Sequence, residues 1–151
     1  MILRLRLRPV CPFCAIAQGL SPAHVVLEED DAVAFLDHRP LFPGHCLLVP
    51  REHWATLSDL PGRDIEPFFR HVQTLARAVE RAVEAEGTFV ALNNRVSQSV
   101  PHLHVHIVPR RRKDGLRGFF WPRTRYADSE HMERVAASVR TALAAEQEAR
   151  S

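Results

Sequence analysis

The sequence is poor in several features that would mark it as a particular kind of protein. It has three cysteines, one tyrosine and two tryptophans among 151 residues, and its net charge is only +2. Three cysteines do not make a disulfide framework, and so small a charge gives no strong field for nucleic acid. No apolar run approaches the roughly 20 residues that a membrane-spanning helix needs. We therefore expect a cytoplasmic protein with no nucleic-acid or membrane partner.

The overall composition predicts one globular domain with short extensions. Apolar residues make up 46% of the chain and charged residues 25%, which is ordinary for a globular protein. In residues 1–10 aliphatic side chains alternate with arginine, unlike the apolar core of a signal peptide. This part is interpreted as a tail, with a leading strand or an over-extended start as alternatives. We expect the central domain over 11–110, and a C-terminal basic and aromatic segment with a helix, over 111–151, packed on it.

Hydrophobic patterns predict an α+β fold. Short β-rich runs predict strands at residues 24–28, 32–37, 45–49, 88–93 and 103–108. Apolar residues recur at three- and four-residue steps over 65–83, which predicts a helix with Asp64 as N-cap and Gly87 as the stop. A last helix is expected from about Ser129. Its inward face would hold Met132, Val135, Ala136, Val139 and Leu143. This order predicts an antiparallel meander of about five strands with one long packed helix.

Three histidines alternate with aliphatic residues between Pro101 and Pro109. In a strand, His102, His104 and His106 share one face at intervals of about 7 Å, while the aliphatic residues face the core. From the residues alone, three interpretations stay open. The strand is half-exposed and carries histidines by chance, the three histidines hold a catalytic zinc, or one imidazole is a nucleophile.

A second set of possible metal ligands has the spacing C-x2-C-x38-H-x48-H. Its members are Cys11, Cys14, His53 and His102. Two thiolates and two imidazoles suit tetrahedral zinc, and four protein ligands predict a structural ion with no open position. Such an ion would tie the N-terminus to the histidine-bearing strand. The alternative is a reduced cysteine pair with a surface histidine at position 53.

The stretch Q-S-V-P-H-L-H-V-H-I-V-P-R, residues 98–110, resembles the signature of the histidine triad superfamily. This superfamily includes the histidine triad nucleotide-binding proteins and diadenosine polyphosphate hydrolases. The resemblance extends through A-F-L-D at 34–37 and P-G-H-C-L-L-V-P at 43–50, and covers about residues 12–110. The cysteine and histidine spacing is similar to that of the zinc-bearing bacterial branch. The resemblance implies the fold of that superfamily.

The resemblance also implies a reaction and its residues. His104 would attack the α-phosphorus of a purine nucleotide conjugate, and water would then hydrolyse the nucleotidyl-histidine. His106 would donate to a phosphoryl oxygen. Ser99, Gln98 and Asn93 would donate to charge in the transition state, unless they only shape a turn. The implied substrate is a dinucleoside polyphosphate or a nucleoside phosphoramidate. A nucleotide-binding or scaffold protein with incidental turnover is the alternative.

The nucleoside pocket follows from the same resemblance. Asp37 would accept hydrogen bonds from the ribose hydroxyls. Apolar side chains would sandwich the base, although the same residues also suit any core. They are Phe13, Ile16, Phe35 and Leu36.

Two further expectations concern the margins of the site. Trp121 and Arg123, with the run of basic residues 110–113, would fold over the active site and suit a polyphosphate leaving group. Members of the superfamily usually pair the long helix and the next strand across a two-fold axis. The apolar stripe over 65–83 suits such a homodimer, and it equally suits packing on the protein's own core.

Overall fold

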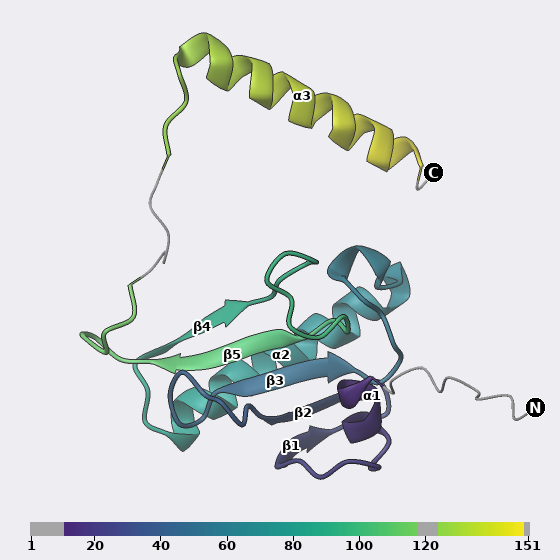
Figure 1. Cartoon of the computed structure of the whole chain (residues 1–151), viewed down its shortest axis with the longest axis vertical. Coiled ribbons are helices and arrows are strands. Elements are labelled where there is room, and N and C mark those ends of the chain that lie inside the picture. The colour runs from purple at the N-terminus through teal and green to yellow at the C-terminus, as the bar shows by residue number, and fades with distance from the viewer. Residues whose placement is uncertain (1–10, 118–123, 150–151) are drawn as a thin grey trace, which may run out of the picture. The chain divides into compact units, whose positions relative to one another are not determined.

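The structure is a computed structural model that describes residues 11–117 and 124–149 (Figure 1). It divides into two compact units at Asp114. The first unit contains α1 (Pro12–Ala17), β1 (Val25–Glu28), β2 (Ala32–Leu36), β3 (Cys46–Pro50), the 3-10 turn η1 (Leu57–Asp59), α2 (Gly62–Ala82), β4 (Gly87–Ala91) and β5 (Val105–Arg110). The second unit contains α3 (Ser129–Glu148). The predicted α+β class is confirmed.

The five strands form one antiparallel sheet in the order β1-β2-β3-β5-β4. The chain leaves the meander after β3, runs through α2, and forms β4 at the edge. β5 then returns between β3 and β4, pairing Leu47 with His106 on one side and Ala91 with His106 on the other. The histidine-bearing segment therefore leads into an interior strand, which fixes its position more firmly than an edge would.

Alternation along the strands gives the sheet two different faces. One face packs against α2 and buries Leu48, Val105 and Ile107 together with Phe68 and Leu75. The opposite face, on the side of α1, buries another cluster. Its members are Phe13, Ala17, Val33, Phe35, Leu47 and Val49. Figure 1 shows α2 crossing behind the sheet and α1 on the other side. The histidine side chains belong to the face of α1.

The long helix differs from the sequence prediction at both ends. α2 begins at Gly62 with Pro61 as its N-cap, so Asp64 lies in the first turn and the prediction that it is the cap is wrong. The helix ends at Ala82, and Gly87 begins β4. Its buried side chains are Phe68, Val72, Leu75 and Val79, whereas Ile65 and Phe69 are exposed. The inward stripe is therefore narrower than the periodicity predicts.

β5 begins at Val105, two residues later than predicted. The reason is that the N–H of Leu103 donates to the carbonyl of Trp54 at 2.6 Å, in the loop after β3, and not to a strand. His102 and His104 therefore lie on the segment that precedes the strand. The aliphatic residues between the histidines still face the core, because Leu103 and Val105 are fully buried in the cluster against α2.

The second unit consists mainly of α3. Asp128 caps the helix by accepting a hydrogen bond from the N–H of His131 at 2.6 Å. Met132, Val139 and Leu143 are more than half exposed, so nothing among the described residues of this unit covers the face that was predicted to be inward. A helix alone has no second layer against which to bury a face. Its packing on the central domain stays a prediction. No helix in the described ranges has the length and apolar character that a membrane span requires.

Candidate active site and metal site

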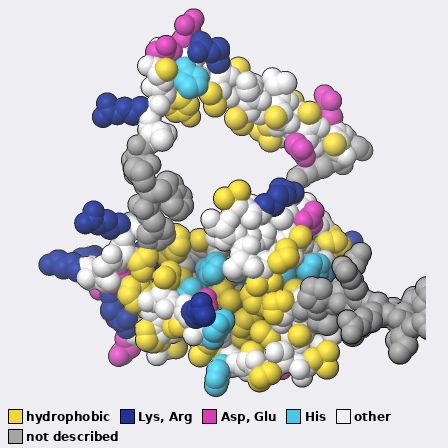
Figure 2. Space-filling view, in the orientation of Figure 1, with side chains coloured by type: hydrophobic (Ala, Val, Ile, Leu, Met, Phe, Trp, Pro, Cys, Tyr) yellow, Lys and Arg dark blue, Asp and Glu magenta, His cyan; other side chains and the backbone are white. Residues whose placement is uncertain are grey.

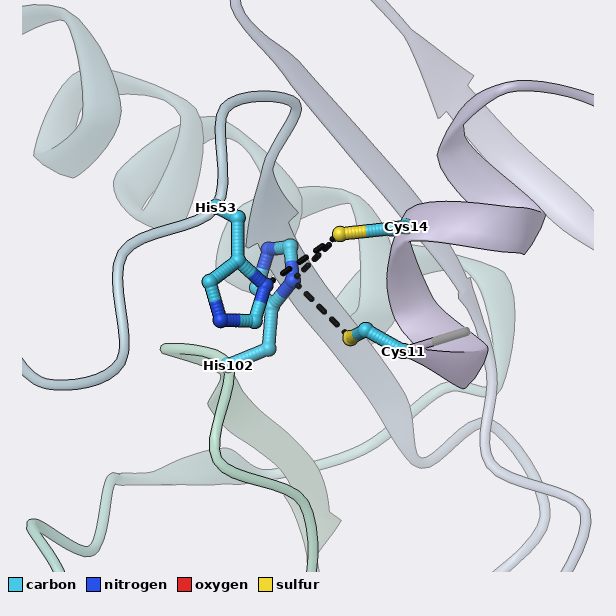
Figure 3. A group of neighbouring side chains, drawn as sticks. All are labelled: Cys11, Cys14, His53 and His102. Atoms are coloured by element: carbon cyan, nitrogen blue, oxygen red, sulfur yellow. Dashed lines mark hydrogen bonds between the residues drawn. The ribbon is translucent and has the colours of Figure 1, made fainter. Parts of the chain in front are cut away.

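Four side chains from three parts of the first unit converge on one point (Figure 3). Cys11 precedes α1 and Cys14 lies within it, His53 follows β3, and His102 precedes β5. Cys14 Sγ lies 3.2 Å from Nδ1 of His53 and 3.5 Å from Nδ1 of His102, while Cys11 Sγ is 3.4 Å from His102 Nδ1. Ligand atoms around tetrahedral zinc are separated by about 3.3–3.8 Å, given bonds of about 2.0–2.3 Å. These three separations are close to those values, and all four donor atoms lie within 4.8 Å of one another, so the predicted set is brought together.

The imidazole of His102 has the tautomer that a metal ligand needs. Its Nε2 lies 2.8 Å from the carbonyl oxygen of Pro50. Because a carbonyl only accepts, Nε2 carries the proton, and the lone pair of Nδ1 points toward the two sulfurs. Complete burial lowers the pKa of His102 to about 4, which keeps the ring neutral. Burial is the main cause that raises the pKa of the Cys14 thiol to about 11, and the nearby Cys11 adds to it. A cation between the two sulfurs would offset this effect.

His104 is oriented by the backbone of His102. The ring is 3% exposed, and its Nδ1 donates to the carbonyl oxygen of His102 at 2.7 Å. Nε2 therefore has a free lone pair, and no hydrogen bond to the described residues occupies it. The ring edge packs against Phe13, with centroids 5.1 Å apart, and against His106 at the same separation. An imidazole held in this way is an available nucleophile.

A chain of hydrogen bonds fixes the proton on His106. The backbone N–H of Leu41 donates to Nδ1 of His45 at 3.1 Å, so His45 carries its proton on Nε2. That Nε2 lies 3.0 Å from Nδ1 of His106 and donates to it. His106 therefore carries its own proton on Nε2 and is a donor there. Burial lowers the pKa of both rings, that of His106 to about 4.

His45 is the functional residue that the sequence prediction missed. It is 3% exposed and stands at the start of β3, behind the turn at Gly44. The φ of Gly44 is +100°, and a Cβ there would meet Val83 Cγ1 at 3.0 Å, so only glycine suits the turn. The only signal in the sequence was the place of His45 inside the P-G-H-C-L-L-V-P motif.

Asp37 is held beside this relay. Its Oδ1 accepts from the N–H of Arg39 at 2.9 Å, and its Oδ2 lies 3.7 Å from Nε2 of His45. The Asp37 side chain is 15% exposed, so the carboxylate remains open to a ligand. These contacts orient the carboxylate without using all of its acceptor positions.

One pocket of about 810 Å³ joins the predicted nucleoside residues to the catalytic ones. Its lining includes Phe13, Ile16, Phe35, Leu36, Asp37, Ser99, His104 and His106. In Figure 2 histidine side chains lie among hydrophobic ones on the face turned to the viewer. The Phe13 and Phe35 rings lie 5.4 Å apart, and both are buried. The pocket thus combines apolar side chains with the Asp37 carboxylate and the imidazoles of His104 and His106, an arrangement that suits a base, a ribose and a phosphoryl group.

Two predicted transition-state donors lie outside this pocket. Gln98 donates from Nε2 to the carbonyl of Ala55 at 2.6 Å and accepts from the N–H of Arg95. Asn93 donates to the carbonyl of Ser97 at 3.2 Å. Their amides hold the loop before His102, as the turn alternative predicts. Of the three, only Ser99 lines the pocket.

The basic run 110–113 does not line the pocket either. Arg110 pairs with Asp114 at 2.6 Å, Arg111 donates to the carbonyl of Val83, and Arg112 lies 3.5 Å from Glu86. These contacts surround the end of β5 that is far from His104. Trp121 and Arg123, which were predicted to cover the site with this run, lie outside the described residues.

The three triad histidines do not form one metal site among the residues that the structure describes. His102 belongs to the cysteine cluster, His106 is grouped with Asp37 and His45, and His104 belongs to neither group. The imidazoles of a tris-histidine zinc site would have to point at one ion. The geometry thus gives no support to the alternative of a zinc metalloenzyme built on the triad.

Comparison with known proteins identifies the relatives of this site. The model of the HIT domain matches residues 18–113. Adenosine 5'-monophosphoramidase HNT1 of Saccharomyces cerevisiae is 33% identical over 109 residues, 70% of this chain and 66% of that protein. The crystal structure of SMU.412c from Streptococcus mutans superposes with a TM-score of 0.80 at 30% identity, covering 90% of this chain and 87% of that one.

A further solved structure bears on the cysteine and histidine cluster. It is a zinc-bound histidine triad family protein from Mycobacterium smegmatis, with a TM-score of 0.68 and 35% identity. The match covers 76% of this chain and 84% of that chain.

Proposed function

Because the chain belongs to the histidine triad family, we propose that it is a nucleotide hydrolase or nucleotidyl transferase acting at the α-phosphate of a purine nucleotide conjugate. The conjugate is a dinucleoside polyphosphate or a nucleoside phosphoramidate. The similarity to a yeast adenosine 5'-monophosphoramidase supports the second class. One observation carries the proposal: the free Nε2 lone pair of His104 and the Nε2–H of His106 border one pocket.

The reaction has two steps that restore the enzyme. In the first, Nε2 of His104 forms a bond to the α-phosphorus, and the bond between phosphorus and the leaving group breaks. The leaving group departs with that electron pair and takes up a proton. In the second, a water oxygen bonds to the phosphorus and the P–N bond breaks, with its electron pair returning to Nε2 of His104. The water releases a proton, which balances the one taken up by the leaving group, and the nucleoside monophosphate departs. His106 Nε2–H, with the hydroxyl of Ser99, donates to the phosphoryl oxygens, where charge develops.

The rest of the pocket positions the nucleoside. Asp37 accepts from the ribose hydroxyls, because its carboxylate is oriented but still accessible. The base lies between apolar side chains, whose flat and branched surfaces do not by themselves choose among purines. They are Phe13, Ile16, Phe35 and Leu36.

We propose structural zinc as the resident metal. Cys11, Cys14, His53 and His102 would hold it, and the ion would supply a fixed link between α1 and the segment of the triad. Closed four-ligand sites of this kind stabilise folds and do not activate water. The spacing of the donor atoms and the tautomer of His102 support this assignment.

We also propose that the protein is a cytoplasmic homodimer. None of its three cysteines forms a disulfide, which suits a reducing compartment. β4 is an edge strand, and Val90 on it and Ile65 and Phe69 on α2 are exposed. Exposed apolar groups beside an unpaired strand edge favour pairing with a second copy.

Turnover of a small substrate panel tests the reaction. The panel contains adenosine phosphoramidate, diadenosine tri- and tetraphosphate, ADP and a guanosine analogue, with His104→Ala beside wild type. Catalysis by the imidazole predicts that the variant loses AMP release by several powers of ten. The ranking of the substrates chooses between the two classes. If neither protein turns over any of them but both bind AMP, the protein is a nucleotide-binding module.

A further inference from the structure

The described part of the pocket lining contains one permanent cation that the proposed reaction does not use. Among the lining residues that the structure describes, Arg39 is the only arginine or lysine, and Asp37 is the only carboxylate. Arg39 is exposed, and no ion pair joins its guanidinium to a described residue. By contrast, Arg110 and Arg112 are paired with carboxylates elsewhere. An unpaired guanidinium that borders a ligand pocket is available to an anionic group of the ligand.

The position of Arg39 relative to Asp37 is fixed by the backbone. The N–H of Arg39 donates to Oδ1 of Asp37 at 2.9 Å, so the two residues share one tight turn. His38, between them, has a side chain that is 87% exposed, with Nδ1 4.0 Å from Asp37 Oδ1. Arg39 and His38 therefore belong to the same turn as the carboxylate that is proposed to accept the ribose hydroxyls, and both residues line the pocket with it.

This pairing of groups is chemically selective. In dinucleotide-binding folds, a carboxylate accepts from a free ribose hydroxyl in sites for one cofactor, and in sites for the phosphorylated cofactor a nearby arginine accommodates the phosphate on the ribose. Here both groups stand in one pocket. Asp37 would accept from the hydroxyl that remains free, and Arg39 would neutralise the phosphate on its neighbour.

We infer that Arg39, with His38, forms a subsite for a second phosphoryl group of the nucleotide, in addition to the one attacked by His104. The inference rests on the proposed function. The ligand group is a phosphomonoester, and it has two sources: a phosphate on the ribose or the terminal phosphate of a 5'-diphosphate. The turn that joins Arg39 to Asp37 favours the ribose.

Binding to a variant that cannot turn over its ligand tests the subsite. We would measure the affinity of His104→Ala by calorimetry for AMP, adenosine 3',5'-bisphosphate, adenosine 2',5'-bisphosphate and ADP. Charge-assisted hydrogen bonds to a guanidinium predict that one of the last three binds about tenfold more tightly than AMP. Adding Arg39→Gln should reduce that ratio to about one. The ratio should also fall with rising salt, because the subsite is exposed.

Arg77→Gln is the matched control, because Arg77 is an exposed arginine on α2 outside the pocket. It changes the net charge equally and should keep the tenfold ratio. Tight binding of a bisphosphate assigns the phosphate to the ribose, and tight binding of ADP assigns it to the 5' chain. The subsite is refuted if neither the bisphosphates nor ADP bind His104→Ala more tightly than AMP does, or if the tighter binding persists when Arg39→Gln is added. In either case, binding of AMP would still support the nucleotide pocket. Failure of AMP itself to bind overturns the proposed function and the subsite with it.

Discussion

The protons on the imidazoles of this site are placed by hydrogen bonds to backbone groups, each of which acts only as a donor or only as an acceptor. A backbone N–H can only donate and a carbonyl can only accept, so Leu41 and Pro50 fix the tautomers of His45 and His102. Because His45 donates from Nε2 to Nδ1 of His106, it fixes the tautomer of His106 as well. The carbonyl of His102 does the same for His104. Hydrogen bonds that begin at backbone groups thus assign the donors and lone pairs of four imidazoles.

His45→Ala tests this relay. Without the donor at Nδ1, His106 can place its proton on either nitrogen, so its Nε2–H is available only part of the time. We expect kcat to fall by about 10- to 100-fold, by analogy with the loss of a hydrogen-bond partner that orients a metal-ligating histidine. Nitrogen NMR of the imidazoles should show His106 protonated at Nε2 in wild type and mixed in the variant. His71→Gln, which changes a histidine outside the pocket, should keep wild-type kcat. A kcat loss with an unchanged tautomer of His106 would contradict the relay.

The lowered pKa of His106 predicts acid sensitivity of the fold. Burial holds this pKa at about 4, whereas the unfolded chain has an imidazole pKa of about 6.5. Between these values the unfolded state binds a proton that the native state does not, so stability falls as the pH falls from about 6.5 to 4. Each pKa unit is worth about 1.4 kcal/mol, so we expect a loss of about 2–3 kcal/mol from this residue by pH 4.5.

Urea unfolding at pH 7 and pH 4.5 measures this effect, with His106→Gln as the comparison. The variant should lose less stability than wild type by that amount, because glutamine does not titrate. Equal losses in the two proteins would show that His106 does not titrate between these values.

At the scale of elements, the site depends on how far-separated segments are brought together. The strand alternation predicted that the three histidines share a face, and the spacing of the cysteines and histidines predicted the metal cluster, because both patterns are local or chemically distinctive. The role of His45 could not be predicted in this way. It depends on the pairing of β3 with β5, which joins residues about 60 positions apart. The start of β5 was misplaced for the same reason, since the loop at Trp54 takes the N–H of Leu103.

The metal cluster joins α1, the loop after β3 and the triad segment, so its loss should loosen all three. His53→Ala is a suitable variant, because His53 is exposed and its removal leaves no cavity. We expect bound zinc to fall below about one equivalent and Tm to fall by several degrees. The reason is that losing about 1–2 kcal/mol of unfolding free energy with the ligand shifts the Tm of a small domain by that much. Elemental analysis and calorimetry measure both.

His104→Ala separates this site from a tris-histidine site. It should retain zinc, because His104 lies outside the cluster. Zinc that is lost with His104→Ala and retained with His53→Ala would refute the assignment.

At the scale of the whole molecule, β4 and α2 present the surface that the proposed dimer would use. Val90, on the edge strand, is 43% exposed. Val90→Arg should place an unpaired charge at the interface and convert the dimer to a monomer, while the β5 side of β4 stays paired. Light scattering coupled to size exclusion measures the mass. Thr74→Arg, on an exposed position of α2, is a charge-matched comparison. A wild-type protein that is monomeric at micromolar concentration would refute the dimer.

The central claim is that His104 becomes covalently nucleotidylated. Mixing wild type with adenosine phosphoramidate or diadenosine triphosphate, quenching in alkaline denaturant to preserve the P–N bond, and sequencing peptides by mass spectrometry tests it most directly. The proposed mechanism predicts an adenylyl group on the peptide containing residues 102–110, located on His104 and absent from His104→Ala. Rapid AMP release with no adduct at any quench time, or an adduct that persists in His104→Ala, would contradict it.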